Sequence, residues 1–343
     1  MKKTAIVVAP GRGTYNRTEL GYLKNHHLAH CGLVAEFDRY RQDQEQIPVS
    51  ELDGAARFSG AKHTSGDNAS PLIYACGYAD FLSIDRTQID IVAVTGNSMG
   101  WYTALACAGA VSAMGGFEIV NTMGRLMQES LIGGQLIYPF VDKDWLPIPN
   151  GREAILRKIA EIDAHVDYEL SVSINLGGML VLAGNDKGLA AFEAVVPRVQ
   201  DRFPMRLPNH SAFHSRLQEP VAERGRSLLD VGLFHQPDIP LVDGRGYIWF
   251  PKSNSLTSLY DYTFGHQIVA TYDFTRAIIT AAREFMPDLV IILGPGTTLG
   301  GATAQSLLLS GWRGLVSKQD FQERQKASPI LISMDDGDQR RQV

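Results

Sequence analysis

The segment at residues 89–111 constrains the fold of this chain more than any other. Residues 89–95 are β-branched and apolar, as in a strand that is buried on both faces. Residues 96–100 read Gly-Asn-Ser-Met-Gly, and residues 101–111 are rich in Ala and Leu, which predicts a turn followed by a buried helix. Because similar strand, turn and helix patterns recur along the chain, we expect an α/β fold with a mostly parallel sheet.

A second pattern interrupts this alternation. Between residues 133 and 207 the expected elements follow the order β-α-β-β-α-β, which is typical of a ferredoxin-like unit. We therefore expect a large α/β-hydrolase-like domain, built from residues 1–132 and 208–343, and a small inserted ferredoxin-like subdomain at residues 133–207. The stretch from about Gln319 onward is polar and predicts a loosely held C-terminal tail.

Composition narrows the class of protein. The 343 residues are 45% hydrophobic and 20% charged, as in soluble globular proteins, and a net charge of -5 predicts no broad basic surface for nucleic acid. No apolar run is long enough for a membrane span, and the apolar stretch Ala5–Pro10 is too short for a signal peptide. Three isolated cysteines fit a reducing compartment, so we expect a cytoplasmic protein without nucleic-acid or membrane partners.

The pentapeptide at residues 96–100 has the pattern Gly-x-Ser-x-Gly between a strand and a helix. This is the context of a nucleophile elbow, in which a sharp turn exposes the serine hydroxyl. Ser98 is therefore a candidate nucleophile, and the N–H of Met99 at the helix start is a candidate oxyanion donor. The alternative is a glycine-rich turn in which Ser98 only caps the helix.

A serine nucleophile needs a base, and the sequence offers nine histidines. His210 and His214 lie close together where the small subdomain would rejoin the main sheet, and spacing alone does not choose between them. His26, His27 and His30 share a predicted helix, where a solvated face is favoured over a metal site. We expect no metal site and no redox cofactor, and the glycine-rich turns lack a nucleotide-binding spacing.

Several motifs, in one order over roughly residues 5–310, resemble the malonyl-CoA:acyl carrier protein transacylase family. Pro10–Gly13 resembles the family's Pro-Gly-Gln-Gly loop, and Gly96–Gly100 resembles its elbow. Gly124–Gln128 resembles the segment that bears its substrate-carboxylate arginine, and Ala212–Ser215 resembles its catalytic-histidine segment.

The resemblance implies a role for each matching residue. Ser98 would be the nucleophile and His214 its base, and the N–H groups of Arg12 and Met99 would form the oxyanion hole. A backbone carbonyl near Asp243-Gly244 would orient the histidine.

The resemblance also implies an acyl-group pocket. Arg125 would bind the free carboxylate of a malonyl group, and Phe213 would crowd its α-carbon. Among the departures from the family pattern, Asn97 replaces a histidine, and Arg12 replaces a glutamine. Asn97 can still donate a hydrogen bond to substrate, whereas the Arg12 side chain adds a cation that binds a carboxylate or a carrier phosphate, or points outward.

The implied reaction moves a malonyl group from malonyl-CoA to the phosphopantetheine thiol of acyl carrier protein, through an ester on Ser98, for fatty acid or polyketide synthesis. One alternative is a serine hydrolase of acyl thioesters, although an α/β-hydrolase would place its histidine after the last strand. The other is a catalytically weak homologue that binds a carrier protein.

Overall fold

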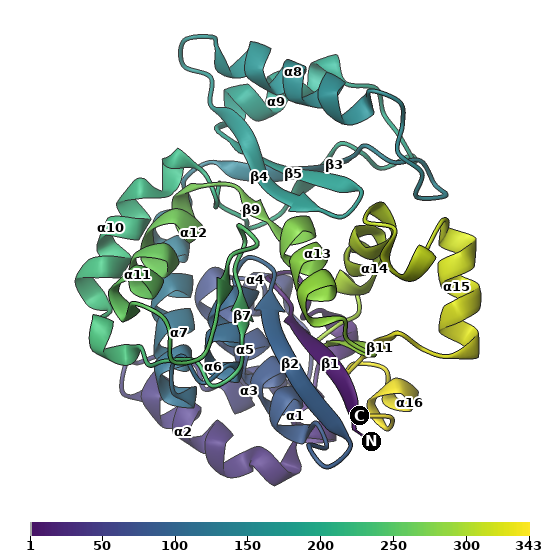
Figure 1. The fold of residues 1–343 in the computed structure, drawn as a ribbon. Coiled ribbons are helices and arrows are strands. Elements are labelled where there is room, and N and C mark those ends of the chain that lie inside the picture. Colours follow the sequence, from purple (N-terminus) through teal and green to yellow (C-terminus); the bar gives the residue numbers. More distant parts are fainter. Residues whose placement is uncertain (1) are drawn as a thin grey trace.

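The computed structural model describes residues 2–343 and contains two sheets that lie one above the other (Figure 1). The large sheet has the order β11-β10-β1-β2-β7-β8, and all its pairings are parallel except that of β7 with β8. Its strands are β1 (Lys3–Ala9), β2 (Ile89–Gly96), β7 (Leu241–Val242), β8 (Ile248–Trp249), β10 (Leu289–Ile292) and β11 (Leu331–Ser333). The predicted α/β class with a mostly parallel sheet is confirmed.

Helices cover both faces of the large sheet (Figure 1). Helices α5 (Gly66–Ser83), α6 (Gly100–Cys107) and α7 (Ala113–Glu129) lie on one face, and α13 (Phe274–Phe285) with α14 (Leu299–Leu309) lies toward the other. The central strand β1 is wholly buried from Ala5 to Ala9, which explains its unbroken apolar sequence. Every residue of α6 is also buried, as its Ala-rich sequence predicts.

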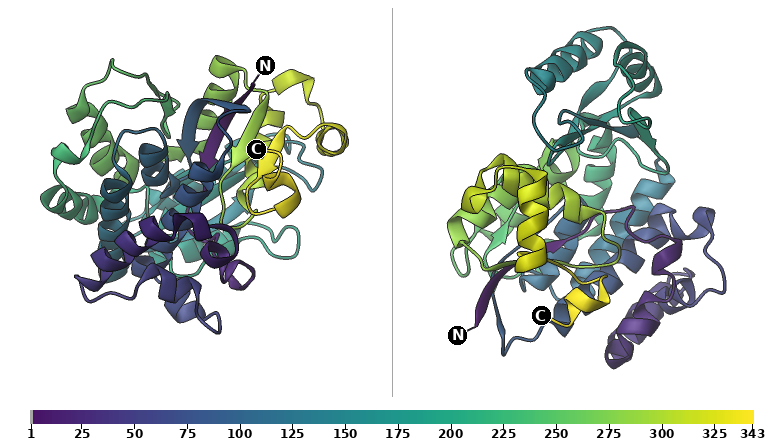
Figure 2. Two further views of the ribbon diagram at one scale, coloured as in Figure 1. Left: turned by 90° about the horizontal axis from the view of Figure 1, so that it is seen from below. Right: turned by 90° about the vertical axis from the view of Figure 1, so that its right-hand side faces the viewer.

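The small sheet has the order β6-β3-β5-β4-β9. Its elements are β3 (Gly134–Pro139), α8 (Gly151–Asp163), β4 (Leu170–Leu176), β5 (Met179–Gly184), α9 (Asp186–Val195), β6 (Met205–Leu207) and β9 (Tyr272–Asp273). The first four strands are antiparallel in the ferredoxin-like order, and α8 and α9 cover the face away from the large sheet (Figures 1 and 2). Strand β9, from outside the expected insert, pairs parallel with β4, and the boundaries at 133 and 207 stay a prediction.

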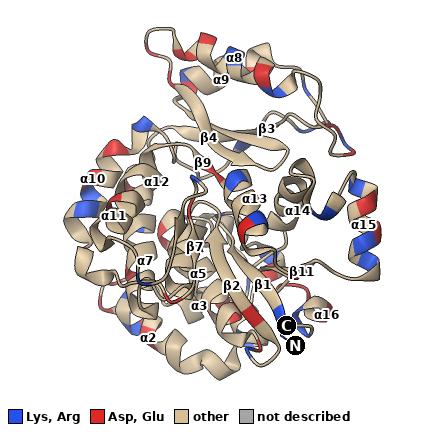
Figure 3. Ribbon diagram, in the orientation of Figure 1, with Lys and Arg blue, Asp and Glu red and all other residues tan. Residues whose placement is uncertain are grey.

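The remaining helices surround these layers. They are α1 (Tyr22–His26), α2 (Cys31–Gln42), α3 (Val49–Asp53), α4 (Gly60–His63), α10 (Glu219–Leu228), α11 (Leu256–Asp261), a π-helix (Tyr262–His266), α12 (Gln267–Val269), α15 (Lys318–Ala327) and α16 (Gly337–Arg340). Acidic and basic residues mix on the outer helices α8, α10 and α15 (Figure 3). Within residues 2–343, no helix has the length and apolar character needed to cross a bilayer.

The C-terminal segment is not the loosely held tail that its polar composition predicts. After α15, the three residues of β11 pair parallel with β10 and form the edge of the large sheet. The carbonyl oxygen of Val343 accepts a hydrogen bond from the N–H of Asp85, 3.1 Å away. A short apolar strand therefore ties this polar segment to the sheet, beside the N-terminus (Figure 2).

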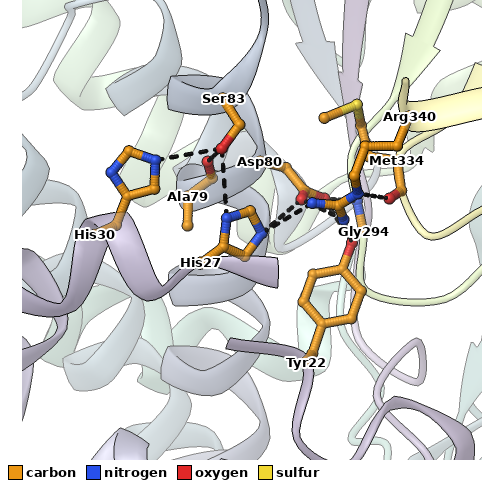
Figure 4. A network of polar contacts seen from close by, with 9 residues as sticks. All are labelled: Tyr22, His27, His30, Ala79, Asp80, Ser83, Gly294, Met334 and Arg340. Atoms are coloured by element: carbon orange, nitrogen blue, oxygen red, sulfur yellow. Dashed lines mark hydrogen bonds and ion pairs between the residues drawn. The ribbon is translucent and has the colours of Figure 1, made fainter. Parts of the chain in front are cut away.

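A buried carboxylate also holds this segment (Figure 4). Asp80 of α5 is fully buried and pairs with Arg340 of α16 at 2.8 Å and with His27 Nε2 at 2.8 Å. Its Oδ2 accepts hydrogen bonds from the hydroxyl of Tyr22 and from the N–H of Gly294. The solvated face expected for the histidine group is thus wrong for His27, which is buried, and residues 2–343 contain no group of side chains suited to a metal ion.

Candidate active site

The turn at residues 96–100 is a sharp elbow between β2 and α6. Ser98 has a φ angle of 55°, which is rare for a residue with a side chain and is typical of strained functional turns. A Cβ at Gly96 would collide with the backbone of Gly100, and a Cβ at Gly100 would collide with the carbonyl of Ala9. The two glycines are therefore required by close backbone contact, and the half-buried Ser98 lies at the tip of the turn between them.

Ser98 and His214 face each other. The Oγ of Ser98 lies 2.8 Å from Nε2 of His214, although the two residues are 116 positions apart in the sequence. Nδ1 of His214 lies 2.5 Å from the carbonyl oxygen of Gln267, which can only accept a hydrogen bond. Nδ1 therefore carries the proton, and Nε2 has its lone pair directed at the serine hydroxyl.

The imidazole of His214 is suited to accept a proton. Its side chain is almost fully buried, and this burial lowers the pKa of His214 to about 4. The ring is thus neutral at neutral pH and ready to act as a base. His210, the alternative left open by spacing, instead donates from Nδ1 to the carbonyl of Pro208 and is not bonded to Ser98.

Gln267 contacts both Ser98 and His214, and the sequence did not indicate this residue. Its carbonyl holds His214, while its side-chain Nε2 donates to the backbone carbonyl of Ser98 at 3.0 Å. The carbonyls expected near Asp243-Gly244 do not perform this role, because they accept hydrogen bonds from the N–H groups of Gly246 and Asp273 instead. A backbone carbonyl leaves no signature in the sequence, so only the fold could identify Gln267.

Two backbone N–H groups near Ser98 are candidate donors. Within residues 2–343 the N–H groups of Arg12 and Met99 donate to no acceptor, which leaves both available. Gly11 packs against the elbow so closely that a Cβ there would lie 2.7 Å from the carbonyl oxygen of Asn97. The oxyanion role of these two N–H groups stays a prediction.

A cavity of about 370 Å³ opens at Ser98. Its walls come from the small sheet, from the loops that follow β1 and β2, and from α7, and most of them are apolar. Lining residues include Val120, Met123, Met127, Ile174, Leu176, Met179, Phe213 and Leu299. The predicted substrate residues Asn97 and Phe213 both lie in this wall, together with Arg12 and His210.

Arg12 points inward rather than toward solvent. Its Nη2 donates to the carbonyls of Thr64 and Asn209 at 2.9 and 3.0 Å, and its Nη1 faces the sulfur of Met127. Burial lowers the pKa of Arg12 to about 10, so the guanidinium remains charged at neutral pH.

Arg125 is not brought to the cavity. The residues of α7 in the cavity wall are Val120, Met123, Gly124 and Met127, whereas the Arg125 side chain is 41% exposed and lies near Glu129. Two residues correspond to about 200° of rotation along a helix, so Arg125 faces away from the side that presents Met123 and Met127. The helical phase of the apolar residues is the sequence signal that distinguishes the cavity side of α7 from the side that bears Arg125.

The arrangement can perform covalent acyl transfer. It supplies a hydroxyl nucleophile, a neutral base with a fixed tautomer, backbone donors at a helix start and a largely apolar cavity for an acyl group. The hydroxyl and imidazole already lie within hydrogen-bonding distance, as a nucleophile and its general base require.

Comparison with known proteins gives a consistent result. No protein-family model matches the chain. It is 22% identical over 235 residues to the malonyl CoA-acyl carrier protein transacylase of Bacillus subtilis, covering 68% of this chain and 70% of that protein.

Solved structures resemble the whole chain. The malonyl-CoA:acyl carrier protein transacylase of Xanthomonas oryzae superposes with a TM-score of 0.76 at 17% identity, over all of this chain and 98% of that one. A malonyl-transacylase solved in complex with a type II polyketide acyl carrier protein gives 0.72 at 18% identity, over 99% and 98% of the two chains. At this identity the structural likeness shows the fold. Together with the sequence relatives, it identifies the chain as a distant relative of the malonyl-CoA:acyl carrier protein transacylases.

Proposed function

We propose that this chain is an acyltransferase that carries a malonyl group as an ester on Ser98, between the thiol of CoA and the phosphopantetheine thiol of acyl carrier protein. The observation that carries the proposal is the 2.8 Å contact between Ser98 Oγ and His214 Nε2, with the tautomer fixed by Gln267. The malonyl group and the carrier protein are inferred from the names of the relatives.

In the first half-reaction, His214 takes the hydroxyl proton as Ser98 Oγ attacks the thioester carbon. The carbonyl oxygen becomes an oxyanion beside the N–H groups of Arg12 and Met99. The intermediate then collapses, the C–S bond breaks, and the proton on His214 passes to the CoA sulfur. Malonyl-Ser98 and CoA thiol are the products.

The second half-reaction reverses these roles. The carrier thiol gives its proton to His214, and its sulfur attacks the ester carbon of malonyl-Ser98. The same donors face the second oxyanion, and the departing Ser98 Oγ recovers the proton from His214. Hydrolysis competes with this step, so a largely apolar cavity favours transfer.

Carrier protein as the acceptor is supported by one relative in particular. A malonyl-transacylase with 18% identity and a nearly full-length match was solved in complex with its acyl carrier protein. Both thiol substrates end in the same phosphopantetheine arm, so one cavity mouth can serve both half-reactions.

The test is intact-mass analysis of the protein after incubation with malonyl-CoA, followed by addition of carrier protein that bears the phosphopantetheine arm. We expect one malonyl adduct, its absence in Ser98→Ala, and its loss to the carrier on mixing. Release of free malonate without carrier acylation would instead identify a thioester hydrolase. If no acyl-CoA of a panel gave an adduct, the chain would be the catalytically weak homologue.

A further inference from the structure

The cavity contains a cation on a different element from the one that the sequence indicated. We propose that Arg12 binds the free carboxylate of the acyl group on Ser98, and that Arg125 does not. The inference rests on the proposed function, since it concerns the acyl group which that reaction transfers.

Position supports Arg12. Ser98 and Arg12 line the same cavity, and Gly11, the residue before Arg12, packs directly on the elbow. A Cβ at Gly11 would lie 2.7 Å from the carbonyl oxygen of Asn97 and 3.5 Å from Cβ of Ser98. The backbone of Arg12 therefore starts next to the nucleophile, and its side chain extends along the cavity wall.

The hydrogen bonds of Arg12 are incomplete. A guanidinium has five N–H groups. In Arg12 two of them reach oxygen atoms, the carbonyls of Thr64 and Asn209, and one reaches only the weak acceptor Sδ of Met127. Its buried Nε has no hydrogen-bond partner within residues 2–343. Donors thus remain for an anionic ligand.

The charge of Arg12 also favours an anionic ligand. Arg12 belongs to no ion pair among residues 2–343, and the charge of Asp67 offsets only part of the effect of burial on its pKa. A desolvated cation without an ion-pair partner is costly, and a ligand carboxylate would compensate for that cost. The complementary need exists in the ligand, because a carboxylate among Met123, Met127 and the other apolar residues requires a cation.

The other arginine of the cavity fits this role less well. Arg202 is exposed, and its guanidinium carbon lies 4.6 Å from the centre of the Phe203 ring. A cation at this solvated position gains little from a carboxylate. The phosphate groups of CoA and of the carrier arm are separated from the thioester by the length of that arm. We therefore assign Arg12 to the acyl carboxylate rather than to a phosphate.

The experiment compares acylation of Ser98 by malonyl-CoA with acylation by acetyl-CoA, which lacks the carboxylate. Arg12→Gln keeps amide donors but removes the charge, and Arg12→Lys keeps the charge. The loss of one hydrogen-bonded charge pair corresponds to a fall of about 100-fold in the malonyl-to-acetyl ratio of kcat/KM for Arg12→Gln. We expect Arg12→Lys to regain about tenfold of this loss, because a point charge replaces the planar guanidinium.

Arg125→Gln is the matched control, since it removes the same charge from the opposite side of α7. Its malonyl-to-acetyl ratio should stay within about twofold of the unaltered protein. Equal losses for both acyl groups in Arg12→Gln, or a selective loss in Arg125→Gln, would overturn the assignment while leaving Ser98 acyl transfer intact. A protein that takes acetyl or longer apolar groups in preference to malonyl would also overturn it. Absence of any acyl-Ser98 adduct would refute the proposed function itself.

Discussion

Arg12 and Arg41 are two desolvated arginines in quite different surroundings. Burial lowers the pKa of each to about 10, and neither forms an ion pair within residues 2–343. Arg41, which is fully buried, directs its three nitrogens at four oxygen acceptors, those of Ile47, Asp67, Asn68 and Asn121. Arg12 has two oxygen acceptors, a thioether and a nitrogen without a partner.

The difference teaches that burial of a cation does not by itself indicate a ligand site. Arg41 is held by neutral oxygens and does not line the cavity at Ser98, so its role is structural. Arg12 has unused donors and lies in the wall of the cavity that contains Ser98. Donor satisfaction, rather than the pKa shift that both share, separates a structural arginine from a binding one.

Arg12 can be a binding arginine only if the cavity beside it is where the chemistry occurs. We expect His214→Ala to reduce kcat/KM for acylation by about ten-thousand-fold, because the serine then has no base. The matched control is His210→Ala, which removes the neighbouring cavity histidine that does not contact Ser98. Stopped-flow release of CoA thiol measures both. A larger loss of kcat/KM in His210→Ala than in His214→Ala would identify His210 as the base and would contradict the assignment of this site.

A third arginine, which is partly buried, extends the comparison to a complete ion pair. Arg340 contacts Asp80, which also accepts from His27, Tyr22 and Gly294 (Figure 4). Asp80→Ala would leave the Arg340 and His27 side chains without their carboxylate. We expect it to lower the free energy of unfolding by about 3–5 kcal/mol. Urea denaturation measures this loss, and a loss below that of Arg41→Met would contradict the ranking.

The fold around these arginines was predictable only in part. The β-branched run of β2 and the glycines of the elbow are local patterns, so the sequence predicts both correctly. Strand β11 consists of only three residues after a polar helix, and its place is decided by pairing with β10 far away in the sequence. Strand β9 has two residues and joins the small sheet from outside the expected insert.

The candidate site, too, was predictable from the sequence only in part. Ser98 and His214 lie in motifs that can be recognised, and the structure brings them together at 2.8 Å. The structure places Arg125 outside the cavity wall, because a motif gives no helical phase, whereas the spacing of Val120, Met123 and Met127 gives it. The role of Gln267 depends on a backbone carbonyl, which every residue type has, so sequence could not predict it.

Arg41→Met tests the structural half of the comparison. The substitution leaves the carbonyls of Ile47 and Asp67 and the amide oxygens of Asn68 and Asn121 without their donor. Since an orphaned buried acceptor costs about 1–3 kcal/mol and part of the site can relax, we expect a total loss of about 3 kcal/mol in stability. Urea denaturation would show a lower midpoint with an unchanged slope. A loss under about 1 kcal/mol would mean that the satisfied contacts of Arg41 contribute little.

Acid stability is linked to the same cavity. Burial, reinforced by the charge of Arg12, lowers the pKa of His210 to about 4, and burial alone is the main cause for His214. Because unfolded histidine titrates near its ordinary pKa of about 6.5, protons bind preferentially to the unfolded chain below that pH. Stability is therefore full above pH 6.5 and falls as the pH drops toward 4. In Arg12→Met this fall should be shallower, since His210 loses its neighbouring cation. A steeper fall in calorimetry at stepped pH would contradict the coupling.

The smallest expected effect is the change in the free energy of unfolding caused by Arg12→Met. It is to be compared with the effect of Arg41→Met. Arg12→Met releases the carbonyls of Thr64 and Asn209, but Asn209 is exposed, so solvent can replace its lost donor. It also removes a desolvated charge that has no counter-ion, which offsets part of that loss. We expect a change within about 1 kcal/mol in the free energy of unfolding, measured beside Arg41→Met in the same urea series. If the two substitutions cost the same, Arg12 is a structural arginine that ties three segments together. A near-neutral result, combined with a selective loss of malonyl transfer, would show that its charge is retained for the ligand rather than for the fold.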